Sequence, residues 1–200
     1  MPGSLSLRSR NLSAVVSSGC NSLRLMTHLA ERLKSKLVTY PDWPKPGVTF
    51  ADLSPVYADP QLRREVTQHF LEVAAANEVD TIAAIESRGY LLGMSLADEL
   101  GLPFVQIRKS GKLPGDCVKV AYSLEYGTAE IEVQSSAFTY GSRVLIVDDV
   151  LATGGTMNAA RELVEETGAT VAAIVVIAEI AFLKGRERLQ GANVSSLLEL

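Results

Sequence analysis

The sequence is poor in the residues that build metal centres and disulfide frameworks. Its two cysteines, Cys20 and Cys117, lie far apart and form no CxxC pair. Its two histidines, His28 and His69, have no partner at metal-ligand spacing, and His69 falls within an amphipathic helical pattern that favours a structural role. These absences argue against a zinc site and a disulfide scaffold. They favour a reducing compartment, for which we expect the cytoplasm.

Long apolar runs and an excess of positive charge are also missing. The longest uninterrupted apolar run, Val171 to Ala178, is far shorter than the ~20 residues that a membrane-spanning helix needs. The formal net charge is −4 and the pI about 5.3, whereas dedicated nucleic-acid binders are usually basic. Neither a membrane nor a nucleic acid is therefore an expected partner. With 200 residues, 47% of them hydrophobic, the chain is sized for one compact domain.

The first 25 residues lack acidic side chains. They contain three arginines and seven serines, and the first acidic residue of the chain is Glu31. This composition suits an organelle transit peptide. Because the apolar spacing is irregular, we favour a poorly ordered extension, or a start at Met26 that leaves the segment out. We treat residues 1–25 as an extension and residues 26–200 as a single domain.

The rest of the chain alternates between helix and strand patterns. We expect helices over residues 29–37, 60–73, 90–100 and 156–167, strands over 79–85, 103–107, 144–147 and 171–177, and a hairpin of 118–122 with 129–133. Continuous apolar strands separated by helices are typical of a parallel sheet covered on both faces. The expected fold class is α/β, with one doubly wound, mainly parallel sheet. Ligands bind such sheets beyond the carboxyl ends of the strands.

The most informative segment follows one of these strands. Two adjacent acids, Asp148 and Asp149, lead into a small glycine-rich turn and then into a helix start. The turn from Ala152 to Thr156 can point several N–H groups inward, and the helix N-terminus adds partial positive charge. Together they form a nest for a phosphate group, to which Thr153 and Thr156 can add hydroxyl donors.

A glycine pair before a helix can also be no more than a tight turn. The two acids argue against that alternative, because neighbouring carboxylates at a strand end are costly to bury together. They suit ribose hydroxyls or the oxygen shell of Mg²⁺. Other phosphate loops do not fit, since the glycines lack GxG spacing and no Gly-Lys-Ser/Thr occurs.

The run from Asp148 to Thr156 resembles the phosphoribosyl-pyrophosphate motif of the type I phosphoribosyltransferases. Residues 86–90, 108–115 and 122–127, together with 46–50 and 183–187, are similar to segments of the adenine-using members of that family. The resemblance runs from about Leu29 to the C-terminus. It implies a parallel-sheet core under a small hood with a flexible loop, and it implies Mg²⁺ dependence and a homodimer. The implied reaction converts adenine and phosphoribosyl pyrophosphate to AMP and pyrophosphate in purine salvage.

The resemblance also implies roles for individual residues. The ribose and its 5-phosphate would be bound by Asp148, Asp149, Ala152, Thr153, Gly154, Gly155 and Thr156. Pyrophosphate would be bound by Ser87, Arg88, Arg108, Lys109 and Lys112, with a cis peptide bond near Ser87. The base would lie between Phe50 and Val150, with main-chain groups of Val48 and Thr49 at its edge. Asp148 and Asp149 would contact Mg²⁺ indirectly, through the ribose or water.

Glu125 and Tyr126 are the expected catalytic residues. They would arrive over the base when the loop closes, and Glu125 is suited to exchange a proton with the purine imidazole ring as the bond to N9 forms. Without the resemblance, Glu125 could equally be a solvated acid at a loop end. Phe50 would then be an ordinary core aromatic.

Two departures from the family pattern affect these expectations. Ala51 and Ser110 stand where many relatives carry basic residues, so we expect changes in affinity for the base and for pyrophosphate, respectively. A phosphoribosyltransferase for a 6-oxo purine is one alternative, although Lys45 is the only lysine near the base segment. A non-catalytic regulator that senses a phosphoribosyl ligand is the other, but the sequence has no basic helix-turn-helix candidate.

Overall fold

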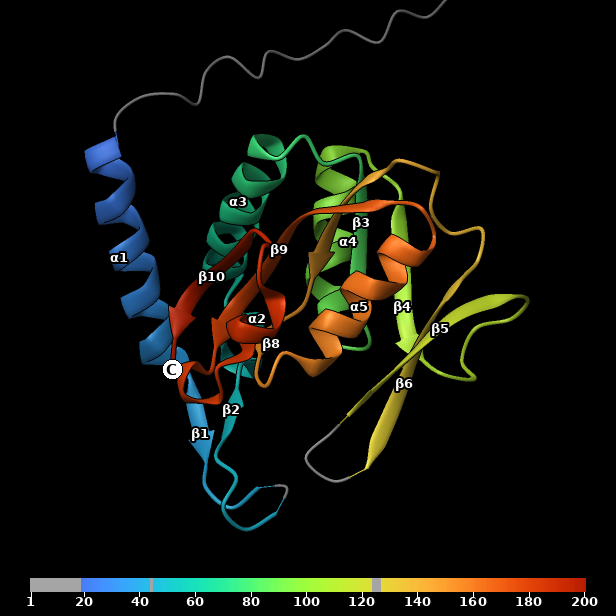
Figure 1. Cartoon of the computed structure of the whole chain (residues 1–200). Coiled ribbons are helices and arrows are strands. Elements are labelled where there is room, and N and C mark those ends of the chain that lie inside the picture. Colours follow the sequence, from blue (N-terminus) through green and yellow to red (C-terminus); the bar gives the residue numbers. More distant parts are fainter. Residues whose placement is uncertain (1–18, 44, 124–126) are drawn as a thin grey trace, which may run out of the picture.

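The computed structural model describes residues 19–43, 45–123 and 127–200, with only the backbone described for residues 19–25 and Ser123. Figure 1 shows a central sheet with helices on both sides. The helices are α1 (Gly19–Lys36), α2 (Ser54–Ala58), α3 (Pro60–Ala76), α4 (Gly89–Leu100) and α5 (Gly155–Glu166), with 3-10 turns η1 (Ala181–Leu183) and η2 (Gly185–Leu189). The strands are β1 (Val38–Tyr40), β2 (Phe50–Asp52), β3 (Thr81–Ile85), β4 (Phe104–Lys109), β5 (Cys117–Ser123), β6 (Thr128–Gln134), β7 (Arg143–Val147), β8 (Val150–Leu151), β9 (Thr170–Glu179) and β10 (Val194–Glu199). No helix among the described residues is long and apolar enough to cross a membrane.

Eight strands form one mixed sheet in the order β10–β9–β7–β3–β4–β6–β5, with β8 paired to β9. The strands from β10 to β4 run parallel to one another, and β8 is parallel to β9. β5 and β6 form the expected antiparallel hairpin, and β6 joins β4 by pairing Arg108 with Glu132 and Lys109 with Ile131. The predicted α/β class with a mainly parallel sheet is confirmed.

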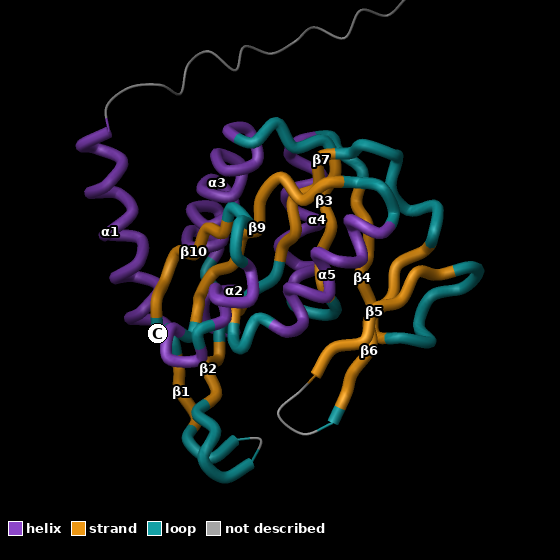
Figure 2. The backbone as a smooth tube through the Cα atoms, in the orientation of Figure 1, coloured by secondary structure: helices purple, strands orange, loops and turns teal. Residues whose placement is uncertain are grey.

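The parallel strands are apolar throughout because each face of the sheet is covered. Successive side chains of a strand point to opposite faces. On β7, Leu145 and Val147 pack into the core formed with α3 and α4, while Val144 and Ile146 pack into the core formed with α5. Figure 2 shows these helices on the two sides of the sheet. Each such fully buried side chain stabilises the fold by about 1.5–3 kcal/mol.

The start of α3 shows how local chemistry fixes an element. The Asp59 side chain accepts hydrogen bonds from the N–H groups of Gln61 and Leu62, and Pro60 occupies the first helical position. Leu62, Val66 and Phe70 are buried as predicted, but the fourth buried position is Ala74, because the stripe repeats every four residues. Val73, which we expected there, is partly buried.

α1 begins ten residues before the helix expected from Leu29. No proline or glycine interrupts residues 20–36, so the helix continues upstream to Gly19. Its buried residues Leu29 and Leu33 join the core beside α3. The Arg32 guanidinium forms a 2.6 Å ion pair with Glu65 of α3.

Two projections extend beyond the carboxyl ends of the parallel strands. One is the antiparallel pair β1–β2, whose intervening proline-rich segment forms a turn, as its composition predicts. The other is the β5–β6 hairpin. Figure 1 and Figure 2 show both extending from the same end of the molecule, one on each side of the strand ends. The carboxyl ends of the parallel strands, where sheets of this class bind ligands, therefore lie between these two projections.

Candidate active site

The turn after β8 presents amide groups at the start of α5. From Ala152 to Met157, no N–H group donates to an acceptor in the part of the chain that the structure describes. The turn lines a hollow of about 90 Å³, to which Asp148 and Val150 also contribute. The first turn of a helix adds positive potential in the same place. This arrangement has the donors and the charge that a bound anion needs.

Two glycines hold this turn against the segment that follows β9. Gly154 caps α5 with a φ of 79°, a conformation that favours glycine. A methyl group on Gly154 would lie 2.4 Å from the carbonyl oxygen of Gly185. A methyl group on Gly185 would lie 2.3 Å from the carbonyl oxygen of Ala152. Neither position therefore admits a side chain without moving the turn.

Asp149 is a buried carboxylate that two distant segments of the chain contact. Its side chain is 3% exposed. Nε of Arg88, at the start of α4, forms an ion pair with Oδ2 of Asp149 over 2.7 Å. The Tyr57 hydroxyl of α2 donates to the same oxygen over 3.3 Å. The sequence did not single out Tyr57, because nothing local shows that α2 folds against the end of β7.

The two adjacent acids favour a hydrogen-bond donor or a cation in their vicinity. Oδ1 of Asp148 accepts the N–H of Asp149 over 2.8 Å. Burial and the neighbouring carboxylate raise the pKa of Asp148, and burial raises the pKa of Asp149 although the Arg88 guanidinium opposes it. A ligand that brings hydroxyl groups or a positive charge would relieve this unfavourable burial of charge.

The close approach of α4 to β7 brings Arg88 and Asp149 together. Gly89 is the first residue of α4, and a methyl group on it would lie 2.7 Å from the carbonyl oxygen of Val147. It would also lie 3.2 Å from Oδ1 of Asp148. Only a residue without a side chain lets the two backbones meet at this distance.

The aromatic residue expected at the base lies beside the same arginine. The guanidinium carbon of Arg88 is 5.5 Å from the centroid of the Phe50 ring, within range of a cation–π contact. Trp43 packs edge-on against Phe50, with 4.4 Å between the ring centroids. Phe50 is half-buried at the start of β2, and Val150 is half-buried in β8. Arg88 thus contacts both the aromatic ring of Phe50 and the carboxylate of Asp149.

The main chain of the base segment is only partly available. The N–H of Val48 donates to the carbonyl of Lys45, and the carbonyl of Val48 accepts from the N–H of Trp43. These bonds close the proline-rich turn and occupy the N–H donor of Val48. Thr49, the next residue, is exposed. A ligand edge at this segment would therefore meet Thr49 more readily than the N–H of Val48.

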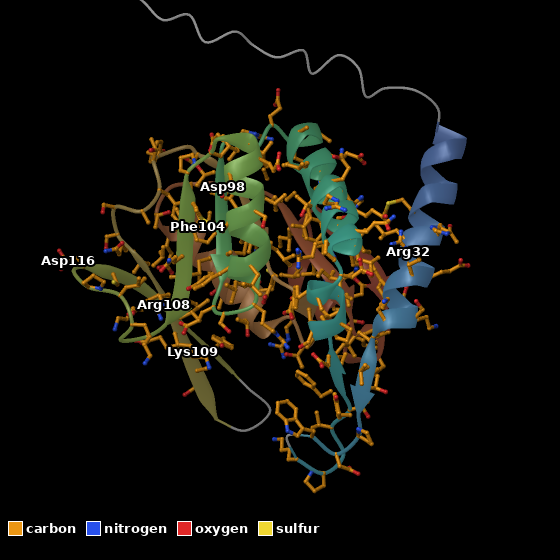
Figure 3. The ribbon with its side chains drawn as sticks, turned by 180° about the vertical axis from the view of Figure 1, so that it is seen from behind. Arg32, Asp98, Phe104, Arg108, Lys109 and Asp116 are labelled. Carbon is orange, nitrogen blue, oxygen red and sulfur yellow. The ribbon has the colours of Figure 1, made fainter. Side chains whose placement is uncertain are left out.

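The cations expected to bind pyrophosphate gather at the ends of β3 and β4. Glu86 accepts from Nε of Arg108 over 3.3 Å and from the N–H of Lys109 over 3.1 Å. The Arg108 hydrogen bond is the main reason why the pKa of Glu86 is lowered. The peptide bond between Glu86 and Ser87 is cis, as the resemblance implied. Figure 3 shows Arg108 and Lys109 together where the β5–β6 hairpin leaves the sheet.

The loop that carries Lys112 is bound to a carboxylate that the sequence analysis overlooked. Glu132 of β6 is 1% exposed, and its Oε1 accepts the N–H groups of Lys112 and Leu113 over 2.7 and 2.8 Å. One clue was in the sequence: Glu132 stands between Ile131 and Val133 in a strand. All three of these side chains are buried.

Glu125 and Tyr126, the expected catalytic residues, lie outside the described residues. Ser87 is exposed, as are the side chains of Lys109 and Lys112. Within the described ranges, no group of three or more His, Cys, Asp or Glu side chains is placed to hold a metal ion. Asp148 and Asp149 are thus the metal-binding candidates in this part of the chain, and they form a pair rather than a cage.

Comparisons with known proteins agree with one another. Residues 55–191 match the family described as phosphoribosyl transferase domain. The chain is 46% identical over 168 residues to the adenine phosphoribosyltransferase of Nitrosococcus oceani, which covers 84% of this chain and 98% of that protein. It is similar to the crystal structure of adenine phosphoribosyltransferase from Rhodothermus marinus, with a TM-score of 0.83, 42% identity and coverage of 87% and 99% of the two chains. The Saccharomyces cerevisiae enzyme, complexed with D-2,5-dideoxy-2,5-imino-altritol 1,6-bisphosphate and adenine, matches with a TM-score of 0.81, 42% identity and coverage of 86% and 99%.

Proposed function

Because this chain belongs to the adenine phosphoribosyltransferase family, we propose that it makes AMP from adenine and phosphoribosyl pyrophosphate. The bond between the anomeric carbon and the pyrophosphate oxygen breaks, and a bond from that carbon to N9 of adenine forms. The N9 proton leaves, and the leaving group departs as pyrophosphate. The reaction recovers a free purine base, which is purine salvage.

The turn from Ala152 to Met157 is the observation that carries this proposal. Its amide groups have no acceptor among the described residues, and they lie at the N-terminus of α5 next to two acids. A sugar phosphate fits both features. Its phosphate accepts hydrogen bonds from the amide N–H groups, while its hydroxyls donate to the two carboxylates. Asp149, held by Arg88 and Tyr57, is fixed before the sugar arrives.

The cations at the ends of β3 and β4 support the assignment of the leaving group. Negative charge grows on pyrophosphate as its bond to the sugar breaks, so positive groups already in place stabilise the transition state. The Arg88 side chain is 42% exposed, and the Arg108 guanidinium forms an ion pair with Glu86. The backbone N–H of Lys109 is bound to Glu86, and that of Lys112 is bound to Glu132.

The base fits between β2 and β8. Phe50 offers a ring face, and Val150 supplies the apolar side opposite in our proposal. Thr49 is the exposed main-chain position at the edge. Glu125 accepts the N9 proton and Tyr126 covers the base when the hairpin closes, a role that rests on the family pattern. Closure keeps water from the activated sugar.

Mg²⁺ fits this site as an ion bound by both the substrate and the protein. The described residues offer a pair of acids rather than a full set, and Mg²⁺ is often held by one or two carboxylates and substrate oxygens. Asp148 and Asp149 would hold it through the ribose or water. The ion would neutralise charge on pyrophosphate. We further propose a homodimer and a cytoplasmic location, with organelle targeting if residues 1–25 direct it.

Turnover with four bases tests the proposal. We expect AMP from adenine, and rates with hypoxanthine, guanine and xanthine lower by about a hundredfold or more, since a site built for an amino donor leaves polar groups unpaired with a 6-oxo base. Equal or faster turnover of hypoxanthine would replace the adenine assignment with a 6-oxo purine. Binding of phosphoribosyl pyrophosphate without any product would indicate a ligand sensor.

A further inference from the structure

The loop between β4 and β5 is organised around one buried carboxylate. Glu132 is 1% exposed, although it is an acid in a short strand of the hairpin. Buried carboxylates persist where hydrogen bonds and countercharge satisfy their oxygens. Here Oε1 accepts the N–H groups of Lys112 and Leu113 over 2.7 and 2.8 Å, and Oε2 lies 3.5 Å from the Lys119 ammonium.

A second ring of contacts ties the same loop to the hairpin. The Lys119 ammonium donates to the Ser110 hydroxyl over 3.0 Å, and the N–H of Ser110 donates to the carbonyl of Glu130. Arg108 donates from Nη1 to the carbonyl of Lys112 over 3.1 Å. Both the amide and the carbonyl of Lys112 are therefore held, and its backbone is fixed relative to Arg108.

The position of this network links it to the phosphate chemistry. Glu132 pairs in register with Arg108 across β4 and β6. The loop begins at Lys109, whose N–H is bound to Glu86 at the end of β3. Figure 3 shows the loop leading from Arg108 and Lys109 at the strand end toward Asp116 at its far tip. Glu132 thus holds the backbone of Lys112 directly and pairs in register with Arg108, whereas Glu86 holds the backbone of Lys109.

We propose that Glu132 is a positioning residue for the pyrophosphate end of the substrate, acting through the backbone of Lys112 and Leu113. This inference rests on the proposed function, in which Arg108, Lys109 and Lys112 bind pyrophosphate. Glu132 itself does not touch the substrate. Its carboxylate fixes the loop before the anion arrives, so the cations need less ordering on binding. Lys119 neutralises the charge of Glu132 and donates a hydrogen bond to the Ser110 hydroxyl. Ser110 therefore helps to hold the loop, whereas a basic side chain at this position would contact the anion itself.

Glu132→Gln is the direct test, because glutamine keeps the size and one carbonyl acceptor but loses the charge. The variant loses the charge on the acceptor of the Lys112 and Leu113 N–H groups. The KM for phosphoribosyl pyrophosphate and the Kd for pyrophosphate alone should each rise about tenfold. The KM for adenine should change by about twofold or less, because the residues proposed to bind the base and the sugar are untouched. The kcat should fall as well, because the same cations stabilise the charge that grows on the leaving group. A role in stability alone would lower Tm without separating the two KM values.

Glu130→Gln is the matched control. Glu130 lies two residues away on the same strand and 3.8 Å from the same Lys119 ammonium, but its side chain is 42% exposed. We expect both KM values and the pyrophosphate Kd to stay at the unmutated level. Amide hydrogen exchange of Lys112 and Leu113 should accelerate in Glu132→Gln and remain slow in Glu130→Gln.

Lys119→Met provides the test if Glu132→Gln does not fold. Lys119 is 45% exposed, so its loss removes the countercharge without opening the core. The KM for phosphoribosyl pyrophosphate and the pyrophosphate Kd should rise about threefold. The inference is overturned if folded Glu132→Gln, or Lys119→Met in its place, keeps both constants unchanged.

The binding measurement separates this inference from the proposed function. An unmutated chain that binds pyrophosphate but forms no AMP would contradict the enzymatic function, while the Kd values of the variants would still test Glu132. An active enzyme whose Glu132→Gln variant matches it in both constants would contradict the inference alone. An unmutated chain that fails to bind pyrophosphate would contradict both.

Discussion

Arg88 bridges a buried acid and an aromatic ring: its Nε lies 2.7 Å from Oδ2 of Asp149, and its guanidinium carbon lies 5.5 Å from the centroid of Phe50. One side chain therefore touches the sugar wall and the base wall of the proposed site. The Arg88 side chain is nevertheless 42% exposed. A guanidinium held in this way is ready to meet an anion.

Replacement of Arg88 should damage both activity and stability. In Arg88→Met, kcat/KM should fall about a hundredfold, because a charged group that stabilises the leaving group is lost. The free energy of unfolding should fall by about 1–3 kcal/mol, because Asp149 stays buried and loses its cationic partner. Steady-state kinetics and urea unfolding measure the two effects. Arg64→Met, on the exposed side of α3, should leave both unchanged, and an active Arg88→Met enzyme would contradict the assignment.

Gly185→Ala should weaken sugar-phosphate binding although residue 185 is outside the turn. A methyl group there would lie 2.3 Å from the Ala152 carbonyl oxygen, so the turn must move. The KM for phosphoribosyl pyrophosphate should rise about tenfold or more, and the stability should fall by about 1–3 kcal/mol. Gly191→Ala is the control, because Gly191 has a φ of 81° but no atom within 4 Å of an added methyl group. It should lose stability and keep its KM.

His69 should make the protein less stable as the pH falls through the ordinary range of histidine. Burial lowers the pKa of His69 although Glu72 opposes this, and Nε2 lies 3.0 Å from the Ser195 hydroxyl. Below the pKa of about 6.5 that His69 has in the unfolded chain, the unfolded chain takes up a proton that the folded chain does not. Stability therefore decreases as the pH falls from there toward the lower pKa of His69 in the folded chain. His69→Gln should show a smaller decrease between pH 7 and 5 in urea unfolding. The same substitution at the exposed His28 serves as the control, and an equal slope in all three proteins would contradict the prediction.

Glu132 should contribute to resistance against acid. Burial opposes its charge, but the N–H groups of Gly111, Leu113 and Lys112 and the Lys119 ammonium outweigh burial and lower the pKa of Glu132 to about 2. A lowered folded pKa stabilises the protein above the ordinary value near 4.5, and this contribution is lost as the pH falls from there toward 2. Glu132→Gln should therefore show a shallower decline in the free energy of unfolding between pH 5 and 3. Parallel curves for variant and unmutated protein would show that this carboxylate is not held as described.

The sequence predicted features that depend on neighbours along the chain. The turn from Ala152 to Thr156 is a contiguous run, and its position a few residues after β7 follows from the apolar pattern of residues 144–147. The helix start at Asp59-Pro60 is equally local, because the cap and the proline act on the residues that follow. The hairpin was predictable for the same reason, since β5 and β6 are joined by a short connection.

Contacts between distant segments were not predictable in this way. Tyr57 and Asp149 are 92 positions apart, and their contact requires α2 to fold against the end of β7. Glu132 shows the other difficulty. An acid in a strand usually faces water, and only the loop from β4 to β5 supplies the amide groups that let it be buried.

The glycine at the start of α4 has a consequence for how substrate preference can change in this fold. The distance between the segments that carry Arg88 and Asp149 is set by the close approach of the Gly89 backbone to the Val147 carbonyl group. It does not depend on side chains that could be exchanged. Substitution therefore has little scope to widen or narrow the sugar side. In the proposed site, the base lies between Phe50 and Val150, and both of these side chains are replaceable. Redesign toward other nucleobases should accordingly succeed at these two residues, while the choice of sugar stays constant.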